Sequence, residues 1–184
     1  MKRKVKEIKM KLKDSKTYQN LMTAYLRESG AYNEYTFYAS QAKKEGYEEI
    51  YNTFTNFAAN EQAHAKIWFK LFHAISSTQD NLVDAADLEN FERTKLYSQF
   101  STVAEEEGFT DIAFLFSEVA KIEKSHEEVY RELARKLKNC QMLCKQEKVT
   151  WQCLNCGHVL VDKCAPETCP VCSHPKGFFN VKEN

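Results

Sequence analysis

Glycine and proline are scarce in this 184-residue chain, with five and three copies, and most of them lie late in the sequence. Because both residues interrupt helices, their scarcity predicts long helices followed by a segment that is built differently. Lys plus Arg equals Asp plus Glu, at 26 each, so no net charge favours nucleic acid as a partner.

The chain also lacks a long apolar run. Its N-terminal residues, 1–15, are basic and carry Val5, Ile8 and Leu12 at helical spacing, without a continuous apolar stretch. They are neither a secretory signal nor a membrane span, and we favour a frayed basic arm over a helix that lies on a membrane. No other segment is apolar enough to span a bilayer, so we expect a cytoplasmic protein without a membrane partner.

The region from about residue 16 to 138 has a helical pattern almost throughout. Weak breaks divide it into the segments 16–45, 47–75, 81–107 and 109–140, each with apolar residues at helical period. Four such segments predict an all-α four-helix bundle. Gly46 and Gly108 mark short turns, so the first and second segments, and the third and fourth, should be antiparallel hairpins.

Acidic and histidine residues lie on the faces that should point inward. Two segments contain a Glu-x-x-His pair, whose members share one helix face because they are three residues apart. A third segment contains two glutamates at the same separation, and the first segment contributes one glutamate. The candidate ligands are Glu28, Glu61, His64, Glu89, Glu92, Glu123 and His126. One such pair is common on solvated helices, but this whole set is typical of di-metal carboxylate bundles.

Carboxylates that converge in a helix bundle repel one another and lose hydration, and a pair of cations removes both costs. Imidazole and carboxylate together suit iron. Tyr35, two turns after Glu28, is a candidate hydrogen-bond donor to a ligating carboxylate. Tyr97, two turns after Glu89, is a second candidate, and a role as an ordinary core aromatic is the alternative for it.

The C-terminal part of the chain contains two Cys-x-x-Cys pairs, Cys153/Cys156 and Cys169/Cys172. Two such pairs predict a tetrahedral four-sulfur site, which suits zinc or iron equally well from spacing alone. The other three cysteines have no partner at this spacing. We interpret Cys140 and Cys144, at the predicted end of the fourth helix, as two half-buried thiols rather than a redox pair, and we expect no ligand role for Cys164.

Several motifs occur in one order and spacing. They are Glu28-Ser with Tyr35-Thr-Phe-Tyr-Ala-Ser, Glu61-Gln-Ala-His64, Glu89-x-x-Glu92, Ala104-Glu-Glu-Glu-Gly108, Glu123-x-x-His126-Glu127, Cys153-x-x-Cys156-Gly157, and Ala165-Pro-Glu-Thr-Cys169-Pro-x-Cys172. On these motifs the chain resembles the rubrerythrins over nearly its whole length. The resemblance implies a ferritin-like di-iron bundle followed by a rubredoxin-like domain. Short β-type runs, Gly, Pro and cysteine pairs begin near Val149, so we place the bundle at 16–144, a polar linker at 145–148 and the second domain at 149–184.

The resemblance also implies the chemistry. Glu28, Glu61, Glu89, Glu92, Glu123 and His126 would bind two irons, with His64 replacing Glu92 in the reduced state, and the four cysteines would bind one iron. The implied activity is a peroxidase that reduces hydrogen peroxide to water in oxidative-stress defence. Electrons would come from NAD(P)H through a separate reductase or rubredoxin. A ferroxidase or iron-handling protein, and a non-catalytic scaffold with a zinc ribbon, are the alternatives.

The chain departs from the family pattern in two respects that matter for assembly and docking. Gly30, Tyr32 and Glu34 stand where the family usually has Gln and two Arg, so Glu34 reverses a charge near the entrance of the site. The connection between the second and third helices is short for a crossover along a bundle. We therefore slightly favour a homodimer that exchanges helix pairs over a bundle closed within one chain.

Overall fold

The computed structural model describes residues 12–73 and 75–182, so most of the predicted basic arm, 1–15, lies outside the described residues. The chain divides into two compact units, the first ending at Ile75 and the second beginning at Ser76.

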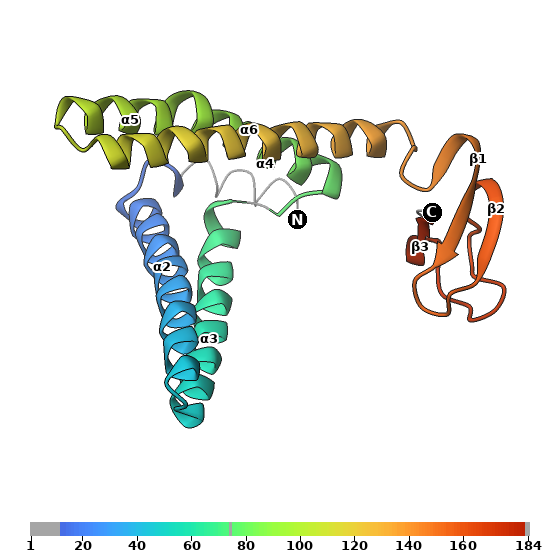
Figure 1. The fold of residues 1–184 in the computed structure, drawn as a ribbon, viewed down its shortest axis with the longest axis horizontal. Coiled ribbons are helices and arrows are strands. Elements are labelled where there is room, and N and C mark those ends of the chain that lie inside the picture. The colour runs from blue at the N-terminus through green and yellow to red at the C-terminus, as the bar shows by residue number, and fades with distance from the viewer. Residues whose placement is uncertain (1–11, 74, 183–184) are drawn as a thin grey trace. The chain divides into compact units, whose positions relative to one another are not determined.

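The first unit is a hairpin of two helices, α2 (Lys16–Lys44) and α3 (Glu48–Phe72), which lie side by side and antiparallel (Figure 1). Ser15 caps α2, because its side chain accepts a hydrogen bond from the Tyr18 N–H. At the other end Gly46 adopts φ +83°, the left-handed conformation that closes a helix and that glycine adopts without a Cβ clash. The predicted glycine turn is therefore confirmed.

Alanines make up the buried part of this hairpin, which brings its two helices close together. The buried residues are Ala39, Ala42, Ala58 and Ala65. Large apolar side chains on the same helices stay exposed, among them Leu26, Phe37, Phe57 and Ile67. A hairpin buries only one stripe of each helix, so these side chains have no cover within the hairpin.

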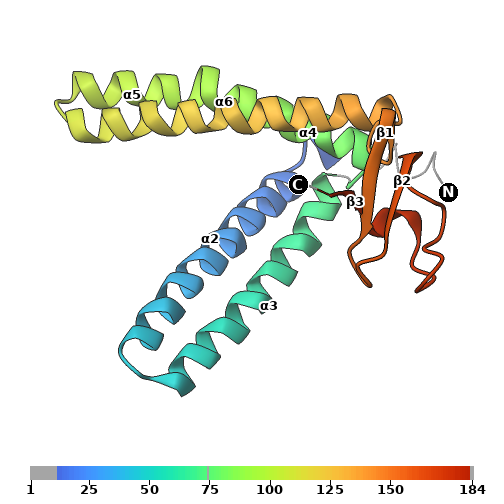
Figure 2. The same cartoon turned by 45° about the vertical axis from the view of Figure 1, so that its right-hand side comes forward.

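The helices of the second unit are α4 (Thr78–Phe91), the π-helical turn η1 (Glu92–Leu96), α5 (Tyr97–Glu106) and α6 (Thr110–Lys138). Both α4 and α5 lie along α6, as the two views agree (Figure 2). The third predicted helix is therefore present but not continuous. The Tyr97 N–H bonds to the Glu92 carbonyl five residues back, which inserts one wide turn directly beside two candidate site residues.

A small antiparallel sheet completes the second unit. Its strands are β1 (Cys144–Cys153), β2 (Val159–Cys164) and β3 (Phe179–Val181), in the order β2-β1-β3. Trp151 and Phe179 are its largest fully buried apolar side chains, at 1% exposure each, and Leu143, Val149 and Leu160 pack around them. The predicted fold class, helical segments followed by a small β-rich domain, is confirmed.

The junction between helix and sheet differs from the prediction in two ways. Helix α6 ends at Lys138, because Cys140 adopts φ +56° and the Gln141 N–H turns back to the Lys136 carbonyl. Residues 145–148, predicted as a linker, belong to β1. Cys144 therefore begins a strand rather than ending a helix, and it forms a disulfide with Cys164. The interpretation of Cys144 as an ordinary thiol and of Cys164 as partnerless was wrong, because their pairing depends on strand register.

Candidate metal centres

One cluster of candidate ligands lies in the first unit, where Glu28 of α2 meets Glu61 and His64 of α3. Their ligand atoms all lie within 4.8 Å of one another. His64 Nδ1 is 3.0 Å from Glu61 Oε2 and 3.9 Å from Glu28 Oε2. Hydrogen bonding with Glu28, and then with His64, lowers the pKa of Glu61. The three groups thus already act on one another as a single cluster.

A second cluster lies in the second unit, where Glu89 of α4 meets Glu123 and His126 of α6. These ligand atoms also lie within 4.8 Å of one another. His126 Nδ1 is 2.7 Å from Glu123 Oε2 and 3.8 Å from Glu89 Oε2. Burial raises the pKa of Glu89, and hydrogen bonding with the Glu123 carboxyl raises it further.

The two clusters have the same composition and nearly the same geometry. Each contains a Glu-x-x-His pair on one helix and a single glutamate on the helix beside it, with the imidazole in contact with both carboxylates. In each cluster the imidazole side chain is about half exposed while the carboxylates are mostly covered. The sequence predicted this pairing correctly within each hairpin, because residues three apart share a helix face.

The donor set of each cluster fits a divalent or trivalent cation. Two carboxylates held close together repel each other when both are ionised, and the neighbouring Glu123 carboxylate contributes to the raised pKa of Glu89. A metal ion bound by two carboxylate oxygens and an imidazole nitrogen replaces that repulsion with attraction, and iron accepts this mixture of ligands.

Glu92 and the two candidate tyrosines lie less centrally. Glu92, the first residue of η1, is not part of the second cluster, but its charge contributes to the raised pKa of Glu89. The pKa of Tyr97 is raised by burial first and then by the carboxylates Glu92, Glu123 and Glu89. Tyr97 therefore lies beside the second cluster as a neutral phenol. The Tyr35 ring packs against Phe54, with 6.1 Å between ring centroids, and its hydroxyl's role stays a prediction.

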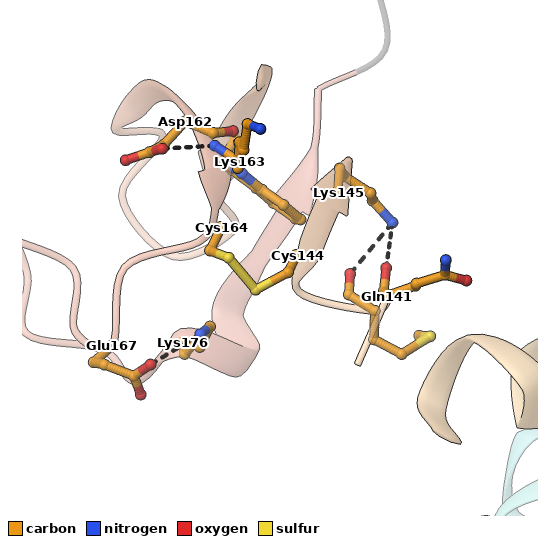
Figure 3. Close-up of a disulfide and its surroundings, with 10 residues drawn as sticks. Gln141, Cys144, Lys145, Asp162, Lys163, Cys164, Glu167 and Lys176 are labelled. Carbon is orange, nitrogen blue, oxygen red and sulfur yellow. Dashed lines mark hydrogen bonds and ion pairs between the residues drawn. A yellow bond between two sulfur atoms is a disulfide. The ribbon is translucent and has the colours of Figure 1, made fainter. Parts of the chain in front are cut away.

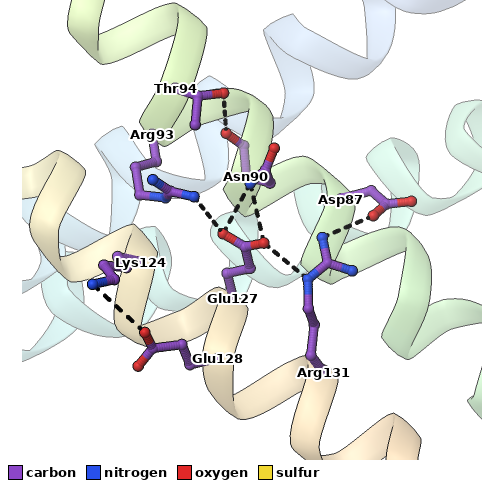
Figure 4. Close-up of polar contacts among 8 residues, drawn as sticks. All are labelled: Asp87, Asn90, Arg93, Thr94, Lys124, Glu127, Glu128 and Arg131. Carbon is purple, nitrogen blue, oxygen red and sulfur yellow. Dashed lines mark hydrogen bonds and ion pairs between the residues drawn. The ribbon is translucent and has the colours of Figure 1, made fainter.

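A polar network that sequence reasoning missed locks α4 and η1 to α6 (Figure 4). Glu127 accepts hydrogen bonds from Asn90 Nδ2 at 3.1 Å, Arg93 Nη2 at 3.0 Å and Arg131 Nε at 2.8 Å. Arg131 continues to Asp87 Oδ1 at 3.1 Å. The Asn90 amide lowers the pKa of Glu127 most, followed by Arg131, and the pKa falls to about 2.

Two members of this network that pair across the helices each follow a candidate ligand directly in sequence. Asn90 follows Glu89, and Glu127 follows His126. Adjacent residues of a helix point about 100° apart, so the ligands face one way while the network faces another and holds the same two helices. The only sequence signal was the i, i+4 pair of Glu127 and Arg131, which is common on helix surfaces.

The four cysteines of the Cys-x-x-Cys pairs form a cage at one end of the sheet. All four sulfurs lie within 4.8 Å of one another, with 3.7 Å between those of Cys153 and Cys172 and 3.6 Å between those of Cys156 and Cys169. A tetrahedron with metal–sulfur bonds of about 2.3 Å has edges of about 3.8 Å. The cage therefore has the size that one tetrahedral metal ion requires.

The two halves of the cage repeat one backbone conformation. The N–H of Cys153 bonds to the carbonyl of His158, and the N–H of Cys169 bonds to the carbonyl of His174, both at 2.8 Å. Gly157 and Ser173, each four residues after the first cysteine of its pair, adopt φ +77° and +59°. This left-handed turn suits glycine, and the second half achieves it with serine.

Backbone amides prepare the cage for thiolates. The His174 N–H lowers the pKa of the Cys172 thiol to about 6. The His158 N–H acts in the same direction on Cys156, but burial and the three neighbouring thiols outweigh it and raise that pKa to about 12. Cys172 therefore loses its proton readily while Cys156 resists, as expected of sulfurs that share one site and need a cation to ionise together.

Comparison with known proteins agrees with both kinds of site. The family model "Rubrerythrin" matches residues 19–134, and the model "Rubrerythrin, rubredoxin-like domain" matches residues 151–180. The chain is 41% identical to a rubrerythrin of Porphyromonas gingivalis, covering 96% of this chain and 95% of that one. It is 40% identical to rubrerythrin-1 of Clostridium acetobutylicum, covering 92% and 96%.

Among solved structures, nigerythrin in a mixed-valence state matches at 27% identity. The match covers 91% of this chain and 87% of that chain with a TM-score of 0.35. The family-model matches and the curated relatives establish that this chain belongs to the rubrerythrin family of di-iron oxidoreductases. Its cofactor is iron, with a di-iron centre for the helical region and one iron for the four-cysteine cage. Family membership thus decides between zinc and iron, which cysteine spacing had left open.

Within the described residues, no helix combines the length and the apolar character that crossing a membrane requires.

Proposed function

We propose that this protein is a peroxidase that reduces hydrogen peroxide to water at a di-iron site, in defence against oxidative stress. Electrons reach that site through the Fe(Cys)4 centre from an NAD(P)H-linked reductase or a rubredoxin. One observation carries the proposal: a single chain holds two matching carboxylate–histidine clusters and a four-thiolate cage. The first kind of site binds and reduces a small oxidant, and the second kind exchanges single electrons.

The proposed ligands of the two irons are Glu28, Glu61, Glu89, Glu92, Glu123 and His126, with His64 taking the place of Glu92 in the reduced state. Bound there, the iron pair supplies the two electrons that the reduction of one peroxide molecule consumes. The position of His64 within the first cluster supports this exchange, since its Nδ1 already lies 3.0 Å from Glu61. Glu92 lies outside the second cluster, on a π-helical turn of the kind that is frequent at functional sites.

The remaining residues of the site hold ligands in place and keep protons available. Tyr97 stays protonated because burial and three nearby carboxylates raise its pKa, so its phenol can donate a hydrogen bond to an oxygen atom beside the second cluster. Tyr35 is the proposed counterpart in the first unit. The Glu127 network fixes α4 and η1 on α6, which keeps Glu89 and Glu123 in register.

The test begins with iron-loaded protein that has been reduced without oxygen. One equivalent of hydrogen peroxide should reoxidise both centres rapidly, and much faster than an equivalent of oxygen does. The visible absorption of the Fe(Cys)4 centre measures the reoxidation of that centre. A clear preference for oxygen would instead favour the ferroxidase, and a cage that shows no Fe(Cys)4 absorption would refute the electron path.

The donor is tested separately. NADH or NADPH with a reductase and a rubredoxin should sustain peroxide consumption, whereas the reduced nucleotide alone should not. If the nucleotide alone drives full turnover, the proposed relay is wrong. We propose that this chemistry takes place in the cytoplasm, because the reducing conditions there keep the four cage cysteines as thiols that can bind a metal.

We also propose that the di-iron sites form in a homodimer that exchanges helix pairs, with α2 and α3 of one copy packing on α4–α6 of the other. Each hairpin holds one of the two three-residue clusters and leaves large apolar side chains exposed, such as Phe57 in the first unit and Phe114 in the second. A complete site needs both hairpins, and burial of exposed apolar side chains gives the dimer its stability.

The length of the connection supports exchange. Helix α3 ends at Phe72 and α4 begins at Thr78, so the connection is residues 73–77 and is short, as predicted. In a bundle closed within one chain, Glu61 and Glu89 lie at one level, and the connection runs from about 16 Å above them to about 16 Å below. The six Cα–Cα steps from Phe72 to Thr78 reach about 20 Å at most, far less than the roughly 33 Å needed.

Complementation between two inactive variants tests the exchange. Glu61→Ala disables the first hairpin and Glu123→Ala disables the second, so each variant alone lacks activity. In an exchanged heterodimer one site receives both mutations and the other receives neither. Refolding an equal mixture should restore about a quarter of the wild-type peroxide turnover per chain, the statistical share of intact sites. A mixture as inactive as its components, or an active monomer, would refute the exchange.

A further inference from the structure

A disulfide between Cys144 and Cys164 joins the first residue of β1 to the last residue of β2 (Figure 3). The two residues are direct partners in the strand register, with 4.0 Å between their Cα atoms. Facing positions on antiparallel strands bring two Cβ atoms within the distance that a disulfide spans. The fold itself therefore brings these two sulfurs together.

The bridge lies beyond an interruption of the strand pairing. The register shifts between Cys144 and Val149, and regular pairing resumes only at Val149 with Asp162. Beside the bridge, on the Cys144 side of this interruption, the Ala165 N–H donates to the Leu143 carbonyl at 2.9 Å, and Lys145 Nζ donates to the Gln141 carbonyl at 2.7 Å. The disulfide is thus the covalent link across a stretch where the β1–β2 ladder is broken.

The disulfide shares no sulfur with the cage, but the loop that it closes contains two of the four cage cysteines. Neither Cys144 nor Cys164 belongs to the four-sulfur cluster, and Cys164 is exposed to solvent. The loop that the bridge closes contains Cys153 and Cys156, the first half of the cage. An exposed sulfur can react with small oxidants and thiols, and closing this loop restricts the unfolded forms through which the cage loses its metal.

We propose that Cys144 and Cys164 are a reversible dithiol–disulfide pair, oxidised by hydrogen peroxide and reduced by a dithiol, that stabilises the four-cysteine domain when oxidised. One thiolate attacks a peroxide oxygen to form a sulfenic acid and hydroxide, and the second thiol then displaces water to form the disulfide. Overall, two thiols and one hydrogen peroxide give one disulfide and two water molecules. A dithiol restores the pair by exchange and is itself oxidised to a disulfide.

Thiol labelling of the iron-loaded full chain tests the pair. After treatment with a dithiol, N-ethylmaleimide should add to Cys140, Cys144 and Cys164, because the metal protects the four cage cysteines. After a short exposure to peroxide, only Cys140 should be labelled, and a peptide cross-linked through Cys144 and Cys164 should appear by mass spectrometry. Labelling of all three cysteines after peroxide, or a cross-link that contains Cys140, would overturn the proposal.

Loss of Fe(Cys)4 absorption in excess chelator tests the stabilising effect. In the wild-type protein the oxidised form should lose its iron roughly tenfold to hundredfold more slowly than the dithiol-treated form. Equal rates would overturn this part of the proposal. The comparison needs no variant, so it stands even if a substitution disturbs folding.

Serine variants provide matched controls. Cys140→Ser should retain both the cross-link and the slow iron loss, whereas Cys144→Ser and Cys164→Ser should lose iron at the rate of the dithiol-treated wild type whether or not peroxide is present. The proposal does not rest on the di-iron peroxidase. The Glu123→Ala variant, inactive as a peroxidase, should still form the disulfide, so the two proposals can fail separately.

Discussion

Phe179 holds the third strand of the four-cysteine domain in place, and its replacement should loosen the cage. The side chain is 1% exposed, and β3, to which it belongs, contains only three residues. It is the register partner of Cys153 on β1, the first cage ligand. The phenyl ring therefore packs directly behind a cysteine that binds the metal, and Phe179→Ala removes support from that ligand.

The expected magnitude follows from the small size of the core. Replacing a buried Phe with Ala costs about 3–5 kcal/mol. Trp151 and Phe179 are the two largest apolar members of the small core of this domain. A domain this small is usually unfolded without its metal, so metal binding supplies the free energy of folding in wild type and variant alike, and the whole cost of the substitution appears as lost affinity. At about 1.4 kcal/mol per tenfold, the apparent affinity for iron should fall by roughly 2 to 3.5 orders of magnitude.

A chelator titration of the full chain measures this change. The quantity compared is the chelator concentration that removes half of the Fe(Cys)4 absorption. Phe178→Ala is the matched control, because it makes the same chemical change at the adjacent residue, whose side chain is 41% exposed. We expect a change of about tenfold or less for that variant. If Phe179→Ala holds its iron as tightly as Phe178→Ala, the reasoning is wrong.

Three further predictions concern the helical region. Glu123→Ala should abolish the di-iron site while the Fe(Cys)4 absorption stays unchanged, and joint loss of both centres would show that the sites are not independent. Because hydrogen bonds from Asn90 and then Arg131 lower the pKa of Glu127 to about 2, its ionised form adds stability at pH values above about 4.5, and that stability is lost as the pH falls towards 2. Glu127→Gln should therefore melt at a lower temperature than wild type at pH 7 and lose less on acidification from about pH 5 to pH 3; parallel melting curves would contradict this. Tyr97→Phe should leave the fold and both iron centres intact and lower kcat for peroxide by roughly tenfold, and a kcat within about twofold of wild type would remove Tyr97 from the mechanism.

Much of the site is local in sequence, and for that reason it could be predicted. The pairs Glu61/His64 and Glu123/His126 are each three residues apart on one helix, so helical geometry alone brings their side chains together. The cage follows from two Cys-x-x-Cys turns with the same backbone conformation. The scarcity of glycine and proline predicted long helices, and turns at Gly46 and Gly108 are present because both glycines adopt a left-handed conformation.

The features that the sequence left undetermined depend on contacts between distant residues. Glu127 is 34 residues from Arg93 and 37 from Asn90, so no local pattern marks their network. Cys144 and Cys164 are 20 residues apart, and only the register of β1 against β2 places them opposite each other. Local spacing thus determined which atoms can bind metal, whereas strand register and helix packing decided how those atoms are held and which two cysteines meet.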